Sequence, residues 1–345
     1  MRFTSRVCTI GFVAAALSLG SFAGLKAASA ADLKVVKFGS VGGMTDAPIY
    51  LADEAGLFAK AGLKVDRQRM TSAPNLMTAT ATGQLDVAGI SITPGLFSSV
   101  QQGMQLRIVG DKQSLRPGVS ATRLVIRSDL DQGNEAKNMQ ALKGKKIAVS
   151  AKASSVYMLL EDLLKKHGMT FSDVQVVELS YPNMLPALTS KAIDAAVDLE
   201  PFLSRAMSAG AVKVVSDLSE FVPPTGSTIV PLVYSEKFAN EKPEAMAFMK
   251  AYLQGVRMYN DAIIKGKDKD KAIAVIAKYA NVKPEIVREA FPAGLDPDQR
   301  VSKEFLDRLQ TFFVQQHYLR STVDVSKVVD LSFADAAVKE LGPYK

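Results

Sequence analysis

The sequence predicts an α/β protein of two similar lobes with mainly parallel sheets, joined by a two-strand hinge and separated by a ligand cleft. One observation is an internal repeat: Ser72-Ala-Pro-Asn75 recurs as Ser180-Tyr-Pro-Asn183, and each copy leads through an apolar helix pattern to an Asp-x-Ala strand start. Another is an alternation of short apolar runs with amphipathic segments, which is typical of mainly parallel sheets. A chain of 345 residues also exceeds what one hydrophobic core usually supports, so two lobes are expected.

Each lobe is expected to follow the order strand, loop, helix, strand, loop, helix, strand. Short apolar runs mark the strands, while Ser near a cap and Pro in a first turn mark helix starts. In the first lobe we expect strands at 35–39, 64–69, 86–90 and 106–109, and helices at 47–60, 74–83 and 94–102. In the second lobe we expect strands at 146–150, 174–179, 194–199 and 212–215, and helices at 154–167, 182–191 and 201–209.

Two β-branched runs, 122–127 and 228–234, border the second series and are expected to carry the chain between the lobes as a hinge. The chain is then mostly helical, with patterns at 243–265, 269–279, 284–291, 303–317 and 333–341. The predicted organisation is therefore a first lobe of 31–122 and 230–300, a second lobe of 123–229, and C-terminal helices in 301–345 packed on the first lobe.

Residues 1–30 read as a secretory signal peptide. Arg2 and Arg6 precede an apolar run that ends in Ala28-Ser29-Ala30, so cleavage near Ala30 is expected, with an uncleaved anchor as the alternative. Export would place the protein in the periplasm. The single cysteine, Cys8, lies inside this segment, so the exported chain has no thiol or disulfide.

Composition argues against nucleic-acid binding and against most catalytic chemistry. Loss of Arg2, Arg6 and Lys26 lowers the formal net charge from +7 to +4, which is too small for a nucleic-acid partner. The exported chain has only His167 and His317, each at a helix end where a structural role is expected. No nucleotide-binding glycine motif occurs, so we predict no cofactor, no metal and no catalytic residues.

Small hydroxyls and free backbone N–H groups at helix starts are the candidate ligand contacts. Such loops can hold an oxyanion, because a helix N-terminus carries unpaired donors and a partial positive charge, and Lys152 could add a full charge. For each residue the alternative is ordinary helix capping. The candidates are Ser40, Gly43, Thr45, Ser72, Asn75, Ser91, Thr93, Ser150, Lys152, Ser154 and Ser155. In an open α/β sheet these loops lie beyond the carboxyl ends of the strands, where ligands bind.

The order of four motifs resembles that of nitrate/sulfonate/taurine-type substrate-binding proteins of ABC transporters. The motifs are Phe38-Gly-Ser-x-x-Gly-x-x-x-Ala-Pro-Ile-Tyr-Leu-Ala52, Gly56-Leu-Phe-Ala-Lys-Ala-Gly-Leu-Lys-Val65, Gly83-Gln-Leu-Asp-Val-Ala88 and Leu142-Lys-Gly-Lys-Lys-Ile-Ala-Val149. The resemblance implies the type II periplasmic binding protein fold. It also implies a receptor that closes on an organic or inorganic anion, a pyrimidine or an aromatic acid, and passes it to a permease in the inner membrane without covalent chemistry. We expect the protein to be a monomer.

The same resemblance places ligand contacts in the loops 40–46, 72–75, 91–93 and 150–155, which adds Met44 and Asp46 to the candidates. In the loop repeat of the second lobe the candidates are Asn183 and Tyr181. Tyr181 is either a wall against an aromatic ligand or part of an ordinary surface turn before proline. Asp198 matches a strand end that faces the cleft, and Glu200 beside it reads better as a helix cap. Two other functions stay open: a ligand-loaded partner of a membrane sensor, and an enzyme on the same fold.

Overall fold

The structure is a computed structural model that describes residues 33–102 and 106–345. The predicted signal peptide, 1–30, lies outside these residues. Residues 33–345 form one compact unit. In the described ranges, no helix has both the length and the apolar composition needed to cross a membrane.

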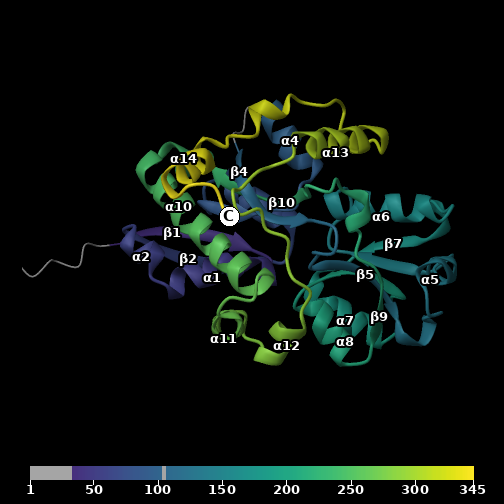
Figure 1. Ribbon diagram of the computed structural model, residues 1–345. Helices are drawn as coiled ribbons and strands as arrows, with labels where there is room; N and C mark the ends of the chain where they lie inside the picture. The colour runs from purple at the N-terminus through teal and green to yellow at the C-terminus, as the bar shows by residue number, and fades with distance from the viewer. Residues whose placement is uncertain (1–32, 103–105) are drawn as a thin grey trace, which may run out of the picture. The chain divides into compact units, whose positions relative to one another are not determined.

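The first lobe is built on a five-stranded sheet with the strand order β2-β1-β3-β10-β4. Strands β1, β2 and β3 are parallel, whereas β10 runs antiparallel to both of its neighbours. Figure 1 shows β10 beside β4, although more than a hundred residues separate them in the sequence. The bounds are β1 Lys34–Ser40, β2 Leu63–Arg69, β3 Val87–Gly89, β4 Leu106–Leu115 and β10 Ser227–Ser235.

The second lobe repeats this arrangement with the order β7-β6-β8-β5-β9. Strand β5 is antiparallel to β8 and β9, and β6 is parallel to β7 and β8. The two sheets therefore have the same topology, as the sequence repeat predicted. The bounds are β5 Thr122–Arg127, β6 Lys146–Val149, β7 Gln175–Glu178, β8 Ala195–Leu199 and β9 Val212–Ser216.

The two runs predicted as hinge strands are the antiparallel strands β5 and β10. The chain leaves the first sheet after β4 and enters the second as β5; it returns after β9 as β10. A strand that arrives from the opposite lobe enters its sheet from the other end, which explains why each sheet is mixed and not wholly parallel. The connecting segments are 116–121 and 217–226.

Helices cover both sheets. The predicted helix 47–60 is two helices, because Gly56 between them adopts a left-handed conformation with φ of 68°. In the first lobe and its extension the helices are α1 Ala47–Glu54, α2 Leu57–Lys60, α3 Ala73–Ala81, α4 Pro94–Gln101, α9 Glu236–Asn240, α10 Lys242–Tyr259, α11 Lys269–Ala280, α12 Pro284–Glu289, α13 Lys303–Gln315 and α14 Ser332–Leu341. In the second lobe they are α5 Glu135–Ala141, α6 Ser155–Lys166, α7 Tyr181–Thr189 and α8 Phe202–Ser208.

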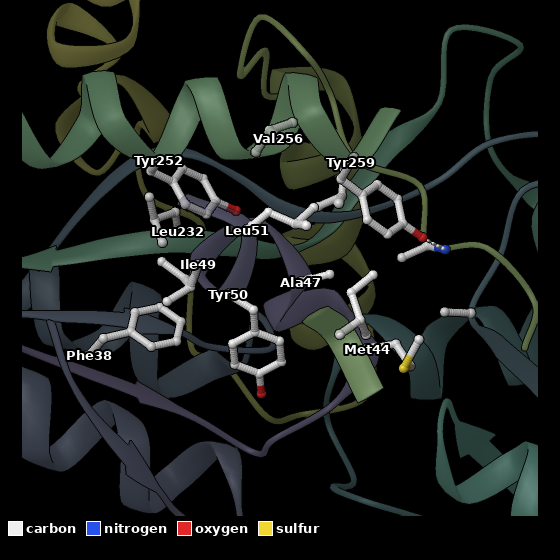
Figure 2. Packing of buried hydrophobic residues seen from close by; sticks show 14 of the residues in the cluster. Phe38, Met44, Ala47, Ile49, Tyr50, Leu51, Leu232, Tyr252, Val256 and Tyr259 are labelled. Atoms are coloured by element: carbon white, nitrogen blue, oxygen red, sulfur yellow. Dashed lines mark hydrogen bonds between the residues drawn. The ribbon is translucent and has the colours of Figure 1, made fainter. Parts of the chain in front are cut away.

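Helix α10 packs against α1 and against the first sheet, where the Tyr252 hydroxyl donates a hydrogen bond of 3.0 Å to the Asp111 carbonyl of β4. Ile49 and Leu51 of α1 are buried, and Tyr252 and Val256 of α10 are fully buried (Figure 2). Tyr259 continues this row and its hydroxyl accepts a hydrogen bond of 2.8 Å from the Ala293 N–H. This packing fixes the start of α1, which carries one of the predicted ligand loops.

Helix α13 contacts both lobes. It packs against α4 of the first lobe and α6 of the second. Arg308 pairs with Asp162 of α6, and the rings of Phe312 and Tyr157 lie 6.2 Å apart. We expected the C-terminal helices on the first lobe; α14 contacts α10 and β4 there, while α13 spans to the second.

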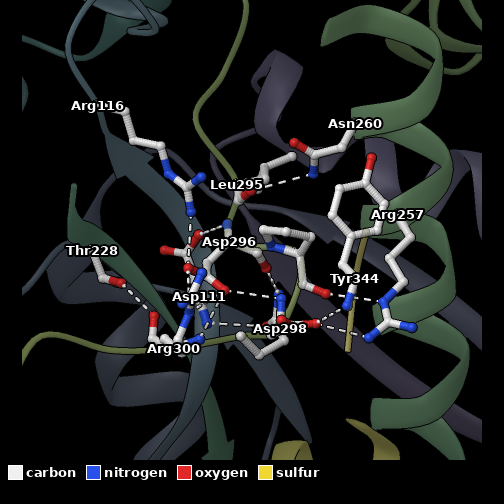
Figure 3. A network of polar contacts seen from close by, with 12 residues as sticks. Asp111, Arg116, Thr228, Arg257, Asn260, Leu295, Asp296, Asp298, Arg300 and Tyr344 are labelled. Carbon is white, nitrogen blue, oxygen red and sulfur yellow. Dashed lines mark hydrogen bonds and ion pairs between the residues drawn. The ribbon is translucent and has the colours of Figure 1, made fainter. Parts of the chain in front are cut away.

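A polar network holds segment 295–300 against the end of β4 (Figure 3). Asp111 of β4 accepts a hydrogen bond of 2.7 Å from the Asp296 N–H. Asp296 pairs with Arg116 at 2.8 Å and with Arg300 at 3.1 Å. Asp111 is fully buried, and burial raises its pKa to about 7.

Candidate functional site

A small cavity lies between the two lobes, beyond the carboxyl ends of their strands. Its volume is about 30 Å³, room for about two water molecules. We call it the interlobe cavity. The first lobe contributes Val41, Thr45, Thr71, Ser72, Ala73, Leu76, Gly89, Ser91, Lys112, Gln113, Ile229 and Val230; the second contributes Thr122, Ser150, Val156, Tyr181 and Leu199.

Five of the predicted site residues line this cavity: Thr45, Ser72, Ser91, Ser150 and Tyr181. Each stands on a loop or helix start that follows a strand, which is why separate parts of the chain converge there. Ser72 is also the N-cap of α3, where its hydroxyl accepts a hydrogen bond of 3.5 Å from the Asn75 N–H. The hydroxyls of Thr71 and Thr122 and the amide of Gln113 add to this polar lining.

Lys112 is the cation among the residues that line the cavity, and no sequence motif predicted it. Its side chain is 3% exposed. Its Nζ lies 2.7 Å from Asp46 Oδ1 and donates a hydrogen bond of 2.6 Å to Thr45 Oγ1. Lys152, which was expected to supply the charge, is exposed and does not line the cavity.

Lys112 was not predicted because strand β4 extends beyond the apolar run that marks it in the sequence. The predicted strand ends at Val109, but pairing with β10 extends it to Leu115 through Asp111-Lys112-Gln113. A polar run directly after an apolar strand, at its carboxyl end, is the signal that would have indicated these residues.

Gly89 makes room for the Lys112 side chain. A Cβ atom at this glycine would lie 1.9 Å from Lys112 Cδ and 2.4 Å from its Cε. The lysine stem therefore passes directly over strand β3 on its way to Asp46. Any larger residue at position 89 would force the stem to move.

Asp46 holds the lysine in place and does not line the interlobe cavity. Its Oδ2 accepts hydrogen bonds from Ser40 Oγ at 2.5 Å and from the Tyr50 hydroxyl at 3.4 Å. Ser40 and Asp46, both predicted contacts, instead border a separate hollow of about 200 Å³ with Arg67 and Arg69.

Gly43 and Met44 form a contact between the lobes. The Met44 N–H donates a hydrogen bond of 3.0 Å to the Glu200 carbonyl of the second lobe. A Cβ at Gly43 would lie 3.1 Å from the Glu200 carbonyl oxygen, so the backbones approach closely here. Both residues are buried and neither lines the cavity.

The start of helix α6 is a cap and a second contact between the lobes. Ser154 is the N-cap; its hydroxyl accepts from the Tyr157 N–H at 3.2 Å and donates to the Ala151 carbonyl at 2.9 Å. The Ser155 hydroxyl donates a hydrogen bond of 2.8 Å to the Ile229 carbonyl of the first lobe. Neither hydroxyl lines the cavity, although the next residue, Val156, does.

Three further candidates lie away from the cavity. Asn75 and Asn183 are exposed on the first turns of α3 and α7. Thr93 is buried, and its hydroxyl approaches Met77 Sδ at 3.8 Å. The structure therefore does not bring these side chains together with the other candidates.

Tyr181 forms a wall of the cavity. Its hydroxyl accepts a hydrogen bond of 3.0 Å from Ser150, and its ring stacks on Phe202 with centroids 5.9 Å apart. Burial raises the pKa of Tyr181 to about 12, so the hydroxyl stays protonated at neutral pH.

Two carboxyl groups lie buried behind this wall. Asp198 is 0% exposed; its Oδ1 accepts from the Leu199 N–H at 2.8 Å, and its Oδ2 has no partner. Burial raises the pKa of Asp198 to about 7. Glu200 accepts from the Ser204 N–H at 3.1 Å, so it caps helix α8, and from the Phe291 N–H at 3.0 Å.

Among the described residues, no group of three or more His, Cys, Asp or Glu is placed to hold a metal ion. The interlobe cavity offers instead one ammonium, several hydroxyls and one amide. This arrangement can bind an oxygen-rich small molecule by hydrogen bonds and by one charge.

Comparison with known proteins gives one family match and several relatives. Residues 44–262 match the family described as NMT1/THI5 like. A protein of Brucella abortus named as a binding protein is 29% identical over 235 residues, which is 67% of each chain. The taurine-binding periplasmic protein of Escherichia coli is 26% identical over 216 residues, 61% of this chain and 63% of that protein.

Solved structures share the fold at low sequence identity. The alkanesulfonate-binding protein SsuA of Xanthomonas axonopodis, bound to MOPS, has a TM-score of 0.68 and 21% identity, covering 87% of this chain and 98% of that one. The nitrate-binding protein NrtA of Synechocystis has a TM-score of 0.72 and 15% identity, covering 90% of each chain. The desulfurization enzyme DszB has a TM-score of 0.62 and 16% identity, covering 89% of this chain and 99% of that one. The fold is therefore that of periplasmic binding proteins, and at least one enzyme shares it.

Proposed function

Because the chain belongs to the NMT1/THI5-like family, we propose that it is the periplasmic substrate-binding component of an ABC importer and captures a small organic anion between its lobes. The observation that carries this proposal is the buried Lys112 ammonium in a cavity that both lobes line with hydroxyls. A buried cation that keeps a hydrogen-bond donor for a ligand, surrounded by hydroxyls, suits an oxyanion such as a sulfonate or carboxylate. The names of the taurine-binding and alkanesulfonate-binding relatives support the same ligand class.

The site that we propose consists of Lys112, Gln113 and Thr122 together with the five predicted residues that line the cavity. The apolar residues Leu76, Val156 and Leu199 would contact the carbon part of the ligand. The partner that we propose is the permease of the importer. As in the sequence analysis, we expect a monomer and an N-terminal segment that is cleaved near Ala30.

A thermal-shift screen tests the proposal. Residues 31–345 are heated with sulfonates, nitrate, aliphatic diacids, aromatic carboxylates or pyrimidines. A ligand that binds only the folded state raises its stability by about 2.7 kcal/mol at a hundredfold excess over Kd. We expect the midpoint of unfolding to rise with one organic anion class; a response to pyrimidines alone would contradict an anionic ligand.

The double variant Lys112→Met/Asp46→Asn is the matched control for that screen. It removes both charges of the buried pair and so avoids the cost of leaving one charge unpaired, which is about 3–5 kcal/mol. Hydrogen bonds to a charged group contribute about 1.5–3 kcal/mol. We therefore expect this variant to fold and to bind the ligand more than tenfold more weakly; unchanged affinity in calorimetry would remove Lys112 from the site.

Two experiments separate the receptor from the other functions on this fold. A receptor returns its ligand unchanged, so mass spectrometry after incubation should recover the ligand alone, whereas an enzyme would yield a product. An importer component is needed for uptake, so cells without the gene should not take up the labelled ligand. Normal uptake by these cells would favour the alternative function, that of a ligand-loaded partner of a membrane sensor.

A further inference from the structure

The Lys112–Asp46 pair is more deeply buried than any other ion pair measured between described residues. Both side chains are 3% exposed. Taking two charges out of water is costly, and the attraction between them offsets that cost only when the geometry is good. A receptor that needed only a cation for its ligand could present it without a buried carboxylate, so Asp46 calls for an explanation of its own.

The three N–H donors of Lys112 account for the charge that the cavity presents. The ammonium forms an ion pair with Asp46 Oδ1 at 2.7 Å and donates one hydrogen bond of 2.6 Å, to Thr45 Oγ1. At least one donor is left for a ligand. The ligand thus meets an ammonium whose charge is already balanced by a carboxylate on the same nitrogen.

Asp46 is firmly held in this position. Ser40 and Tyr50 both direct hydroxyl groups at its Oδ2. Because Gly89 has no side chain, the Lys112 stem has room to pass over strand β3 and reach Asp46. Among the described residues, no Asp or Glu lines the cavity. The carboxylate that acts on the charge of the cavity is therefore Asp46, through its ion pair with Lys112.

We infer that Asp46 selects the ligand by its charge. By balancing the charge of Lys112, Asp46 admits anions of low charge with several acceptor oxygens and excludes dianions. This inference rests on the proposed function, because it concerns the ligand of the same cavity. A second negative charge on the ligand would lie close to Asp46 in a site with little water, where repulsion is strong. A monoanion such as a sulfonate satisfies the free donor and the hydroxyls with one charge.

Sulfate and methanesulfonate test the inference, because they present similar oxygens and differ by one charge. Asp46→Asn keeps the size of the side chain and removes its charge. We expect calorimetry to show sulfate binding Asp46→Asn at least roughly tenfold more tightly than it binds the wild type, from the loss of one like charge at an effective dielectric constant of about 20. Methanesulfonate should gain less than sulfate.

Two controls make the result specific. Asp46→Glu keeps the charge, so it should keep the low affinity for sulfate. Lys112→Met/Asp46→Asn lacks the ammonium and should not bind sulfate. If Asp46→Asn does not fold, Asp46→Ser removes the same charge with a smaller side chain and takes its place.

The inference would be overturned if Asp46→Asn, or Asp46→Ser, bound sulfate no better than the wild type, or if both anions gained equally. This outcome is distinct from failure of the proposed function. The ligand screen concerns the wild type and the double variant, whereas sulfate binding to the Asp46 variants is read without knowing the natural ligand.

Discussion

Buried ionisable groups are the residue-scale feature of this protein. Lys112 and Asp46 form an ion pair at 2.7 Å, whereas the Oδ2 of Asp198 has no hydrogen-bond partner. Burial is the largest cause that raises the pKa of Asp198, to about 7. The same residue type therefore serves as a counter-ion at one position and is held close to its neutral form at another.

The Asp198 carboxyl should make the protein less stable as the pH rises. Its pKa is about 7 in the folded protein and about 3.9 in an unfolded chain. The stabilisation that its proton gives the folded protein is complete below pH 4 and is lost as the pH rises to 7, on the order of 4 kcal/mol in all. Urea unfolding should show the free energy of unfolding of the wild type falling from pH 5 to pH 7, and Asp198→Asn falling less.

Asp111 titrates in the same range, with a pKa of about 7, but it is present in both proteins. The difference between the two profiles therefore isolates Asp198. Parallel profiles for the wild type and Asp198→Asn would mean that the Asp198 carboxyl is ionised in the folded protein at pH 5.

At the scale of the elements, helix capping and lining of the interlobe cavity use the same residue types at different helix starts. Ser72 caps α3 and also lines the cavity. Ser154 caps α6 but is 1% exposed and turned into the backbone of its own loop. Ser150, just before that loop, lines the cavity and donates to Tyr181. All three are serines near a helix start, so the sequence pattern does not separate their roles. The direction of each side chain does.

Ser154→Ala and Ser150→Ala form a matched pair on this loop. Loss of the α6 cap should lower the free energy of unfolding by about 1 kcal/mol, with ligand affinity nearly unchanged. Loss of the Ser150 hydroxyl should change stability little and weaken ligand binding several-fold, since a neutral hydrogen bond contributes about 1 kcal/mol. Urea unfolding and calorimetry measure the two effects; the reverse assignment would place Ser154 in the site.

At the scale of the whole described unit, the two lobes touch around the cavity. Met44 and Glu200, Ser155 and Ile229, and the α13–α6 contact all join them. The cavity between them, about 30 Å³, is too small for an organic anion beyond its head group. We propose that the two lobes, each taken as one sheet with its covering helices, separate to admit the ligand and close on it.

Solution scattering tests this closure. The radius of gyration of the ligand-free protein should be larger than that of the saturated protein. Glu200→Ala removes the carboxylate that accepts from the Phe291 N–H, so the ligand-free variant should be at least as expanded as the wild type and should still contract with ligand. Identical scattering with and without ligand would argue against lobe closure.

The sequence by itself determined the two-lobed α/β fold, the family and several of the loops that line the interlobe cavity. These follow from local signals: the repeated Ser-x-Pro-Asn loop, the alternation of strands and helices, and the caps at helix starts, all of which depend on neighbours along the chain.

Only the tertiary structure decided which of the candidates face the cavity and which cation serves it. Lys112 enters the site because pairing with β10 extends β4, and because Gly89 on β3 leaves space for its stem. Lys152, Asn75 and Asn183 point to solvent, while Gly43, Met44 and Ser155 join the lobes. Side-chain direction at a loop depends on contacts between residues distant in sequence, and no local pattern records those contacts.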